Sequence, residues 1–325
     1  MGEIMQLLTS FSKSKIEKKA FEKTLGELDF ENFKTQNNIA AIIYFTSGYC
    51  EKTISELCEN YFKSIPYIGC SVEGIANNNA SSEAAFAFTM NLVKFSDRAN
   101  VNTYAYNDVF SSGDKIGKML AENTLKHQDK LNIILSDGLK TDATSILNVF
   151  NENVESAKFK SMVVGGLAGD MMLMKETWVL SNRFLSNNGL VGFGLSGEFK
   201  FEIDLVHGCS PIGEPMNVTK VDGNYVVEFD GQPAWPQIQN FYPEEIAKDK
   251  SIENTYLGVT EIKDASDINR FDTPVRAPLA TREDGAIFFC KRFDLNDQVS
   301  IAKRDSEYII NTSKDLLSDI VERKP

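Results

Sequence analysis

The sequence predicts an α/β protein with a largely parallel or mixed sheet and flanking helices, followed by an antiparallel, hairpin-rich region and a smaller α+β second lobe. Three observations predict this fold class. In the first half of the chain, continuous apolar runs of strand length alternate with helical patterns. Asn188-Gly189 and Asp222-Gly223 are two-residue turn signals between later strand patterns. Prolines then crowd residues 211–243, and a lobe boundary is predicted near Gln232 to Pro243.

The first elements follow from the spacing of apolar residues. Residues 14–28 have their apolar side chains at helical spacing, so 1–36 is predicted to be an N-terminal helical segment. Residues 39–45 form a continuous apolar run, which is typical of a strand covered on both faces. The helix after this strand has a regular apolar stripe that includes Cys58 and Tyr61, so both side chains are expected to pack inward.

Predicted strands end in loops of small and polar residues at several places. These strand exits are Thr46–Cys50, Cys70–Gly74, Ser136–Gly138 and Gly165–Asp170. Because the carboxyl ends of parallel strands meet at the same edge of a sheet, the exits are expected to converge on one crevice. Glycine-rich turns leave backbone amides uncovered, so this crevice suits a small polar ligand.

The chain beyond Asp170 is predicted to form hairpins and a terminal helix. Residues 199–206 alternate between apolar and other side chains, which is typical of a strand with one solvated face. The last helix begins near Thr312, and its apolar residues are expected to face inward; they are Leu316, Leu317 and Ile320. The predicted division is therefore 1–36, an α/β domain at 37–234 and a second domain at 235–325.

Charge and composition argue against several functional classes. The formal net charge of −12 argues against nucleic acid and anionic membrane surfaces as partners, since both need a basic protein surface. No apolar run has the length of a membrane helix, and the N-terminus lacks a signal-peptide pattern. The five cysteines are odd in number and scattered, which favours reduced thiols and a cytoplasmic location. Neither a CxxC pair nor an HExxH motif is present, so no metal site is expected.

Several motifs carry a resemblance to a known family. They are GCSVEGIA at 69–76, VVGGLAGD at 163–170, GLVGFGLSG at 189–197, HGCSPIGEPMNVT at 207–219 and EFDGQPA at 228–234. In their order and spacing they resemble the FIST family of bacterial signal-input modules, which have an N-terminal and a C-terminal part. By this resemblance, 37–234 is a FIST N-like sensory domain and 235–325 is a FIST C-like domain.

The resemblance implies a non-catalytic, cytoplasmic sensory module that binds a small polar ligand such as an amino acid. It also implies a separate signalling partner, such as a histidine kinase, a chemoreceptor or a cyclic-dinucleotide enzyme. Some family members are described as heme proteins that sense nitric oxide. The family's C-terminal part is expected to continue into a Ser-Cys-x-x-Arg type stretch, whereas this sequence stops at Pro325 after a helix. The FIST C-like domain is therefore expected to be incomplete.

The candidate ligand-binding residues come mainly from the strand exits. An amino acid needs an acceptor for its ammonium group, and the carboxylates of Glu73, Asp137 and Asp170 are the candidates. The full predicted set is Ser47, Cys70, Ser71, Glu73, Gly74, Asp137, Gly165, Gly166, Ala168, Asp170, Arg183, Cys209 and Arg276. The alternative interpretation of each is a turn or packing residue.

The carboxylate of an amino acid needs hydrogen-bond donors. The backbone amides of Gly165 and Gly166 are the first candidates, because bare amides in a glycine turn form anion-binding concavities. Arg183 and Arg276 are alternative clamps, since a guanidinium group can hold a carboxylate with two parallel hydrogen bonds.

Thiol and heme chemistry are weaker hypotheses. Cys70 and Cys209 each lie in a Gly-Cys-Ser sequence, and they are either pocket contacts and redox reporters or small buried residues. A nucleophilic cysteine needs a histidine base, and only His127 and His207 exist, so no enzyme activity is predicted. His207 or Cys209 could ligate a heme iron, which leaves a gas sensor as the alternative function. A scaffold that binds no small ligand is the third hypothesis.

Overall fold

The computed structural model describes residues 5–77, 80–203, 208–242, 257–261, 274–289 and 292–323. The chain packs as two compact units, Met1–Phe199 and Lys200–Pro325. The sequence-based division, with boundaries after residues 36 and 234, differs from this packing. The N-terminal residues contribute a strand and core side chains to the first unit, and the strands within 209–229 pair with strands near the end of the chain.

A six-stranded sheet of the first unit has the order β1-β6-β2-β3-β10-β11. Its strands are β1 (Gln6–Ser12), β2 (Ile39–Phe45), β3 (Tyr67–Ser71), β6 (Phe88–Lys94), β10 (Val179–Ser181) and β11 (Phe184–Ser186). β2 and β3 pair in parallel, and the other pairs of this sheet are antiparallel. β1 stands where the sequence predicted the start of a helical segment. It forms a strand because it pairs with β6 along its whole length.

A second sheet has the order β7-β12-β8-β9. It contains β7 (Ala99–Asn107), β8 (Leu131–Ser136), β9 (Met162–Leu167) and β12 (Gly189–Gly197). β8 and β9 are parallel, whereas β12 runs antiparallel to β7 and β8. A short ribbon of β4 (Ile75–Ala76) and β5 (Ser81–Ser82) is separate from both sheets. The predicted mixed α/β class is confirmed, with two sheets in place of one.

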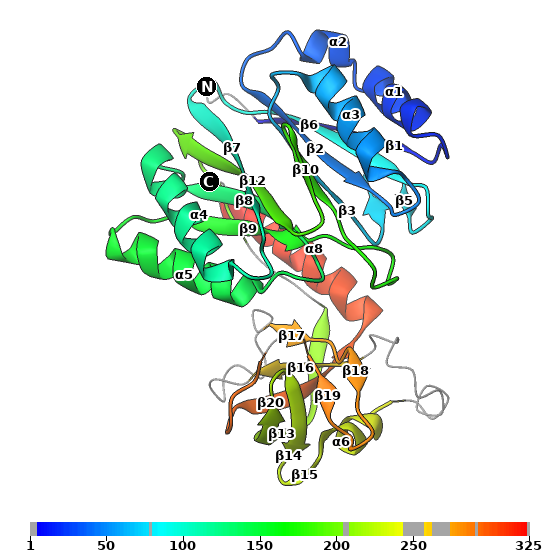
Figure 1. Ribbon diagram of the computed structural model, residues 1–325, viewed down its shortest axis with the longest axis vertical. Helices are drawn as coiled ribbons and strands as arrows, with labels where there is room; N and C mark the ends of the chain where they lie inside the picture. Colours follow the sequence, from blue (N-terminus) through cyan, green and yellow to red (C-terminus); the bar gives the residue numbers. More distant parts are fainter. Residues whose placement is uncertain are drawn as a thin grey trace. The chain divides into compact units, whose positions relative to one another are not determined.

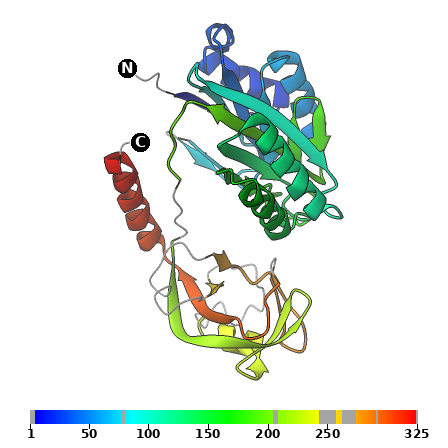
Figure 2. The same cartoon turned by 90° about the vertical axis from the view of Figure 1, so that its left-hand side faces the viewer.

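The first unit has four layers in the order helix, sheet, sheet, helix (Figure 1). α1 (Glu17–Glu27), α2 (Phe30–Phe33) and α3 (Glu51–Phe62) cover the six-stranded sheet, while α4 (Gly113–His127) and α5 (Ala143–Ser156) cover the four-stranded sheet, as Figure 2 also shows. The inner faces of the sheets meet where β3 and β10 lie against β12. β3 is buried throughout, and β12 is buried from Gly189 to Ser196. Burial on both faces explains their continuous small or apolar runs.

Two local predictions have different outcomes at the level of side chains and turns. Cys58 is buried in α3 as predicted, but Tyr61 is only partly buried and its hydroxyl donates to Glu22 at 3.0 Å. The Asn188-Gly189 signal does not close a hairpin. β11 before it pairs with β10, and β12 after it lies in the other sheet, so this turn carries the chain from one sheet to the other.

The second unit is built on an eight-stranded antiparallel sheet. Its strands are β13 (Cys209–Asp222), β14 (Tyr225–Phe229), β15 (Gln232–Pro233), β16 (Leu257–Glu261), β17 (Val275–Arg276), β18 (Ala280–Thr281), β19 (Ile287–Phe288) and β20 (Gln298–Arg304). The predicted turn at Asp222-Gly223 is confirmed as the hairpin between β13 and β14. α6 (Ala234–Gln239) packs on the core of this unit through Ala234 and Ile238.

The terminal helix α8 (Ser306–Arg323) has no buried residue. The prediction that Leu316, Leu317 and Ile320 face inward is therefore wrong, and Leu317 is 62% exposed. Amphipathic spacing gives a helix an apolar face, but burial needs a surface to cover that face. In the described part of the second unit, the core is formed by strands and α6 instead.

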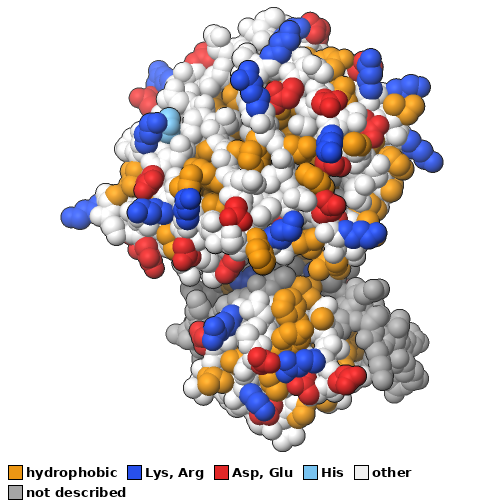
Figure 3. All heavy atoms as spheres, in the orientation of Figure 1, with side chains coloured by type: hydrophobic (Ala, Val, Ile, Leu, Met, Phe, Trp, Pro, Cys, Tyr) orange, Lys and Arg blue, Asp and Glu red, His pale blue; other side chains and the backbone are white. Residues whose placement is uncertain are grey.

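Helix length and surface charge bear on two questions, whether the chain has a membrane-spanning helix and whether it has a basic surface for nucleic acids. Across the described residues, no helix combines the length and apolar character needed to span a membrane. On the face of the molecule shown in Figure 3, basic and acidic side chains are interspersed, without a broad basic region. The argument against polyanionic partners rests on the net charge of −12.

A buried polar network lies at the amino end of β8, opposite the strand exits. Asn102 Nδ2 donates to both carboxylate oxygens of Asp129 at 2.9 Å, and the whole Asp129 residue is 0% exposed. Tyr104 donates its hydroxyl hydrogen to Asn132 Oδ1 at 3.0 Å, and Asn132 Nδ2 donates to Ser161 Oγ at 3.0 Å. Burial raises the pKa of Asp129, against the lowering effects of the Asn102 hydrogen bond and of the nearby His127.

This raised pKa predicts a specific pH dependence of stability. Between the ordinary carboxyl pKa of about 4 and the raised pKa of folded Asp129, the folded chain binds more protons than the unfolded chain. The stability contribution of Asp129 therefore decreases as pH rises through that interval. Urea unfolding of the wild type and of Asp129→Asn across this pH range should give a stability difference, wild type minus variant, that falls with rising pH. A difference independent of pH would contradict the assignment.

Candidate functional site

Three of the strand exits meet between the two sheets of the first unit. Gly169 N donates to Ser71 O at 2.9 Å, which joins the exits of β9 and β3. Ala168 N donates to Ser136 O at 2.8 Å, which joins the exits of β9 and β8. Asp170 N donates to Glu73 Oε1 at 3.2 Å. We call Ser71, Glu73, Asp137, Gly138, Asp170 and Thr177 the exit cluster. It forms because two parallel strand pairs in facing sheets end at the same place, not because one sheet contains all the strands.

Both oxygens of the Asp137 carboxylate accept hydrogen bonds from nearby residues. Its Oδ1 accepts from Leu139 N at 3.0 Å and from Lys140 N at 2.6 Å. Its Oδ2 accepts from Thr177 Oγ1 at 2.7 Å, and Thr177 Oγ1 in turn accepts from Gly138 N at 2.8 Å. Asp137 is 0% exposed, so it organises the turn after β8 and is not placed to receive a ligand.

Asp170 holds the loop that follows it, residues 171–176, which we call the methionine loop. Asp170 Oδ1 accepts from Met174 N at 3.1 Å, and Oδ2 accepts from the backbone amides of the next two residues, Lys175 and Glu176, at 2.6 and 3.3 Å. Met171, Met172 and Met174 have φ angles of 61°, 59° and 53°. Side chains other than glycine rarely adopt this region; each such residue costs about 1–3 kcal/mol and persists only where its surroundings enforce it. The buried Asp170 carboxylate closes the loop around these residues through the amides of Met174, Lys175 and Glu176.

Glu73 is the carboxylate of the exit cluster that stays open to solvent. Its residue is exposed, whereas Asp137 and Asp170 are buried. Ser71 is also buried, and its Oγ accepts from Trp178 N at 2.9 Å. Among the carboxylates that the sequence proposed for an ammonium group, Glu73 is therefore the one that geometry leaves accessible.

The comparison with protein families bears on what such a cluster does. The sequence model of the FIST N domain matches residues 40–232, which is more than half of the chain. The chain belongs to the FIST family. FIST domains are sensory signal-transduction domains and are generally non-catalytic. The matched range contains the whole exit cluster and continues into β13 and β14 of the second unit.

Two curated relatives share part of this FIST chain. They are the uncharacterized proteins MT0656 and Rv0628c of Mycobacterium tuberculosis, from strains CDC 1551 / Oshkosh and ATCC 25618 / H37Rv. Each is 29% identical over 103 residues, a stretch that covers 32% of this chain and 26% of the relative. The alignment thus spans about a quarter of the length of these relatives.

Other candidate residues of the FIST chain lie outside the exit cluster. Ser47 is exposed at the exit of β2. In the same exit, Gly48 N donates a hydrogen bond at 2.8 Å to Ala85 O, which lies in the segment before β6. Gly74 lies against Glu83, where an added Cβ would come within 3.0 Å of Glu83 Cγ. Arg183 is exposed in the turn between β10 and β11.

The remaining candidates belong to the second unit or lie outside the described residues. Arg276 is on β17, and its Nε is buried without a hydrogen-bond partner among the residues that the structure describes. Cys209 begins β13 and is 7% exposed. His207, the proposed heme ligand, and Cys290 lie outside the described residues. The heme alternative therefore stays a prediction.

The two cysteines proposed as a pair belong to different units, and both are buried. Cys70 lies in β3, is 2% exposed, and has its thiol pKa raised to about 12 by burial. A thiol in that state has almost no thiolate at neutral pH and reacts poorly. Among the described cysteines, Cys50 is the exposed one, at the start of α3.

This difference predicts the order of thiol labelling in the native protein. With a maleimide at pH 8, we expect Cys50 to react at least about a hundredfold faster than Cys70, because the thiolate is the reacting species and, of these two described thiols, Cys50 is the accessible one. Peptide mapping by mass spectrometry after timed quenching distinguishes the sites. Labelling of Cys70 at the rate of Cys50 would restore the redox-reporter hypothesis.

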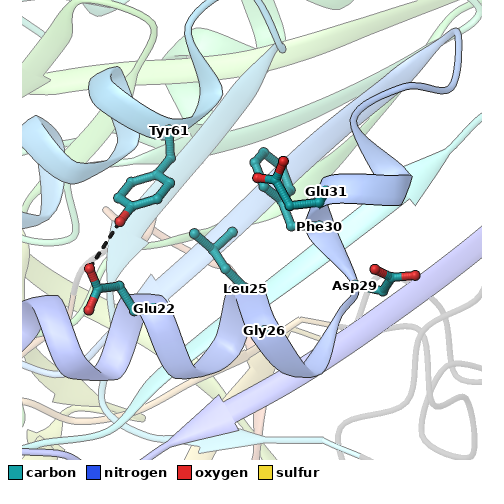
Figure 4. A pocket seen from close by; sticks show the side chains of 7 residues that line it. All are labelled: Glu22, Leu25, Gly26, Asp29, Phe30, Glu31 and Tyr61. Atoms are coloured by element: carbon teal, nitrogen blue, oxygen red, sulfur yellow. Dashed lines mark hydrogen bonds between the residues drawn. The ribbon is translucent and has the colours of Figure 1, made fainter.

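A separate hollow of about 200 Å³ lies between α1, α2 and α3 (Figure 4). Its lining is apolar at Leu25, Phe30 and Tyr61, and acidic at Glu22, Asp29 and Glu31, with Gly26 completing it. Two of the acidic groups are paired, Glu22 with Lys18 at 3.7 Å and Glu31 with Lys34. Sequence reasoning missed this hollow because it arises from a bend between two helices, which leaves no motif.

Proposed function

We propose that the chain is a cytoplasmic sensory input module that binds a small polar metabolite, an amino acid or a related compound, at the exit cluster. It then relays occupancy to a separate signalling protein, such as a histidine kinase, chemoreceptor or cyclic-dinucleotide enzyme. The observation that carries the proposal is the strained methionine loop, which the Asp170 carboxylate holds where three strand exits meet. Family membership supports the sensory role.

The accessible groups of the cluster suit a zwitterion. Glu73 offers an exposed carboxylate for an ammonium group. Directly after Asp170, the amides of Met171 and Met172 have no hydrogen-bond partner among the described residues, so they are candidate donors for the ligand carboxylate. The amide of Gly165 fits this role less well. It lies inside β9, four residues before Gly169, and an extended chain of about 3.3 Å per residue puts it as much as roughly 13 Å away.

Relay to a partner follows from the same loop. The methionine loop can be held by the Asp170 carboxylate or released from it. A ligand that bonds the amides of Met171 and Met172 has a different affinity for these two conformations, and this difference shifts the population between them. The loop exposes Met172, Leu173 and Met174, which are 56%, 55% and 60% exposed. Flexible methionine side chains form adaptable protein-binding surfaces. Ligand occupancy would thereby change the surface offered to the signalling partner.

A thermal-melt screen tests the proposal. The purified chain is heated with amino acids, small carboxylates, nucleotides and hemin; a ligand at about a hundredfold above its Kd adds roughly 2.7 kcal/mol, which moves the Tm by a few degrees. We expect one amino-acid class to raise the Tm of the wild type. The shift should disappear in Glu73→Gln, which keeps an acceptor for Asp170 N, and persist in Glu152→Gln, an exposed carboxylate on α5.

The other outcomes are equally informative. An equal shift in Glu73→Gln would move the ligand away from the exit cluster. A shift with hemin alone, together with a Soret band, would favour the gas-sensor function. A flat response over the whole panel would favour the interaction scaffold.

A further inference from the structure

β9 is an edge strand of the four-stranded sheet (Figure 1), and the backbone groups on its open side have no hydrogen-bond partner among the described residues. Met162 N donates to Lys130 O at 3.0 Å and Ala168 N donates to Ser136 O at 2.8 Å, so the even-numbered residues face β8. In a parallel ladder the N–H and C=O of one residue point to the same side, and successive residues alternate. The backbone groups of Val163, Gly165 and Leu167 therefore point to the open side.

This edge lacks the devices that keep edge strands from pairing. Proteins protect such strands with charged side chains, proline, bulges or very short length. The other edges of the two large sheets of this unit are β1, β7 and β11. β1 and β7 contain several polar residues, and β11 has three residues. β9 has the sequence MVVGGL, with no polar side chain and a regular register along β8.

Apolar side chains are also exposed along this edge. Met162 and Leu167 are 48% and 50% exposed, and the exposed side chains of the methionine loop follow directly in sequence. Contiguous exposed apolar residues of this kind mark interaction sites. An uncharged strand edge beside them favours an extended strand as the occupant.

We propose that a second copy of this chain pairs with β9, antiparallel, about a twofold axis at Gly165. The outward residues then match themselves: Val163 lies opposite Leu167 of the second copy, and Gly165 lies opposite its own counterpart. Each of these opposed pairs exchanges two backbone hydrogen bonds, and the two four-stranded sheets join into one.

The chemistry of the edge favours a second copy over an unrelated strand. The outward residues are Val163, Gly165 and Leu167, an apolar residue on each side of a glycine. This order is the same in both chain directions, as an interface between two identical strands about a twofold axis requires. Gly165, on the axis, has no side chain to crowd its counterpart; a Cβ there would lie 1.8 Å from Ile134 O of β8, so pairing with β8 already requires glycine at this position. β9 itself carries no charged side chain although each chain carries −12, so the paired strands bring no like charges of their own together.

The test compares association of the full chain with two substitutions of Leu167. Leu167→Pro removes an outward N–H, which an edge strand tolerates when that side is open. Leu167→Val keeps the N–H and is the matched control. By size exclusion with light scattering over a dilution series, we expect a dimer for the wild type and for Leu167→Val. Leu167→Pro should dimerise about thirtyfold more weakly, since two hydrogen bonds per dimer are lost.

Hydrogen exchange gives a second readout that needs no variant. The amides of Val163, Gly165 and Leu167 should become more protected as wild-type concentration rises. A chain that stays monomeric at every concentration, or a dimer unaffected by Leu167→Pro, would overturn the proposal. Protection of these amides in a monomer would assign the edge to another segment of the same chain and would also overturn it. None of these results depends on whether a ligand binds the exit cluster.

Discussion

Gly138→Ala is expected to destabilise the first unit by about 3–5 kcal/mol. Most point substitutions cost about 0.5–3 kcal/mol, and larger losses arise from a few mechanisms such as a steric clash in a packed region. A Cβ at Gly138 would lie 1.8 Å from Ala168 O and 3.0 Å from Ala168 C. Both contacts are with backbone, so no side-chain rotation relieves them. The exits of β8 and β9 would have to separate, which weakens the hydrogen bond from Ala168 N to Ser136 O and the contacts around Asp137.

Gly166→Ala is the matched control for this prediction. Gly166 is also a glycine of a predicted strand exit and lies near the end of β9, but a Cβ there would meet nothing within 4 Å, and its φ angle is not positive. Such a replacement is expected to change stability by less than about 1 kcal/mol, with slight stabilisation from the lower entropy of the unfolded chain. Urea unfolding followed by circular dichroism measures both variants. Equal losses for the two glycines would contradict the close approach at Gly138.

The two glycines show what the sequence can and cannot predict. Both lie beside apolar strands in glycine-containing exits, and the sequence alone treats them alike. What separates them is the backbone that another strand brings near, and this depends on pairing between distant segments. Local patterns predicted the strands at 39–45 and 131–135 and the burial of Cys58 in α3 correctly, because apolar spacing within one element determines those features.

Strand pairing was the main feature that local patterns could not determine. Alternation of strands and helices predicted a largely parallel or mixed sheet, and the structure has the mixed form: parallel pairing occurs at β2–β3 and β8–β9, and antiparallel partners from far along the chain complete both sheets. β12, for example, inserts between β7 and β8. The exits still come together, because the two parallel pairs end in facing sheets.

The roles of the acidic residues were the second feature that the sequence left open. Asp137 and Asp170 look like ligand-binding residues when only their position after a strand is considered. The structure shows that each accepts hydrogen bonds from amides a few residues later in the chain. Short acidic side chains commonly bond nearby backbone in this way, so the pattern had a local structural explanation beside the functional one. Glu73, on a longer side chain, remains exposed.

Asp170→Ala is expected to lower stability by about 2–4 kcal/mol and to release the methionine loop. The substitution removes one carboxylate that accepts from three backbone amides; hydrogen bonds to charged groups contribute about 1.5–3 kcal/mol each, and water that reaches the freed amides of this exposed loop recovers part of that sum. The positive φ angles at Met171, Met172 and Met174 then lose the group that enforces them. Hydrogen exchange of the amides of Met174, Lys175 and Glu176, which the carboxylate bonds, should rise by at least about tenfold, more than the exchange of other loops rises from the global loss of stability.

Two further substitutions separate the role of the Asp170 hydrogen bonds from the effect of losing a negative charge. Asp142→Ala removes an exposed carboxylate that accepts from a single amide, Ser145 N at 3.1 Å, at the start of α5, and should cost about 1 kcal/mol. Asp170→Asn keeps one acceptor oxygen and should fall between Asp170→Ala and the wild type in both stability and loop exchange. If Asp170→Ala costs no more than Asp142→Ala and leaves exchange of the loop unchanged, the loop holds its conformation without the carboxylate. The proposed relay would then lose its physical basis. It requires two conformations of the methionine loop, one held by the Asp170 carboxylate and one released, between which a ligand can shift the population.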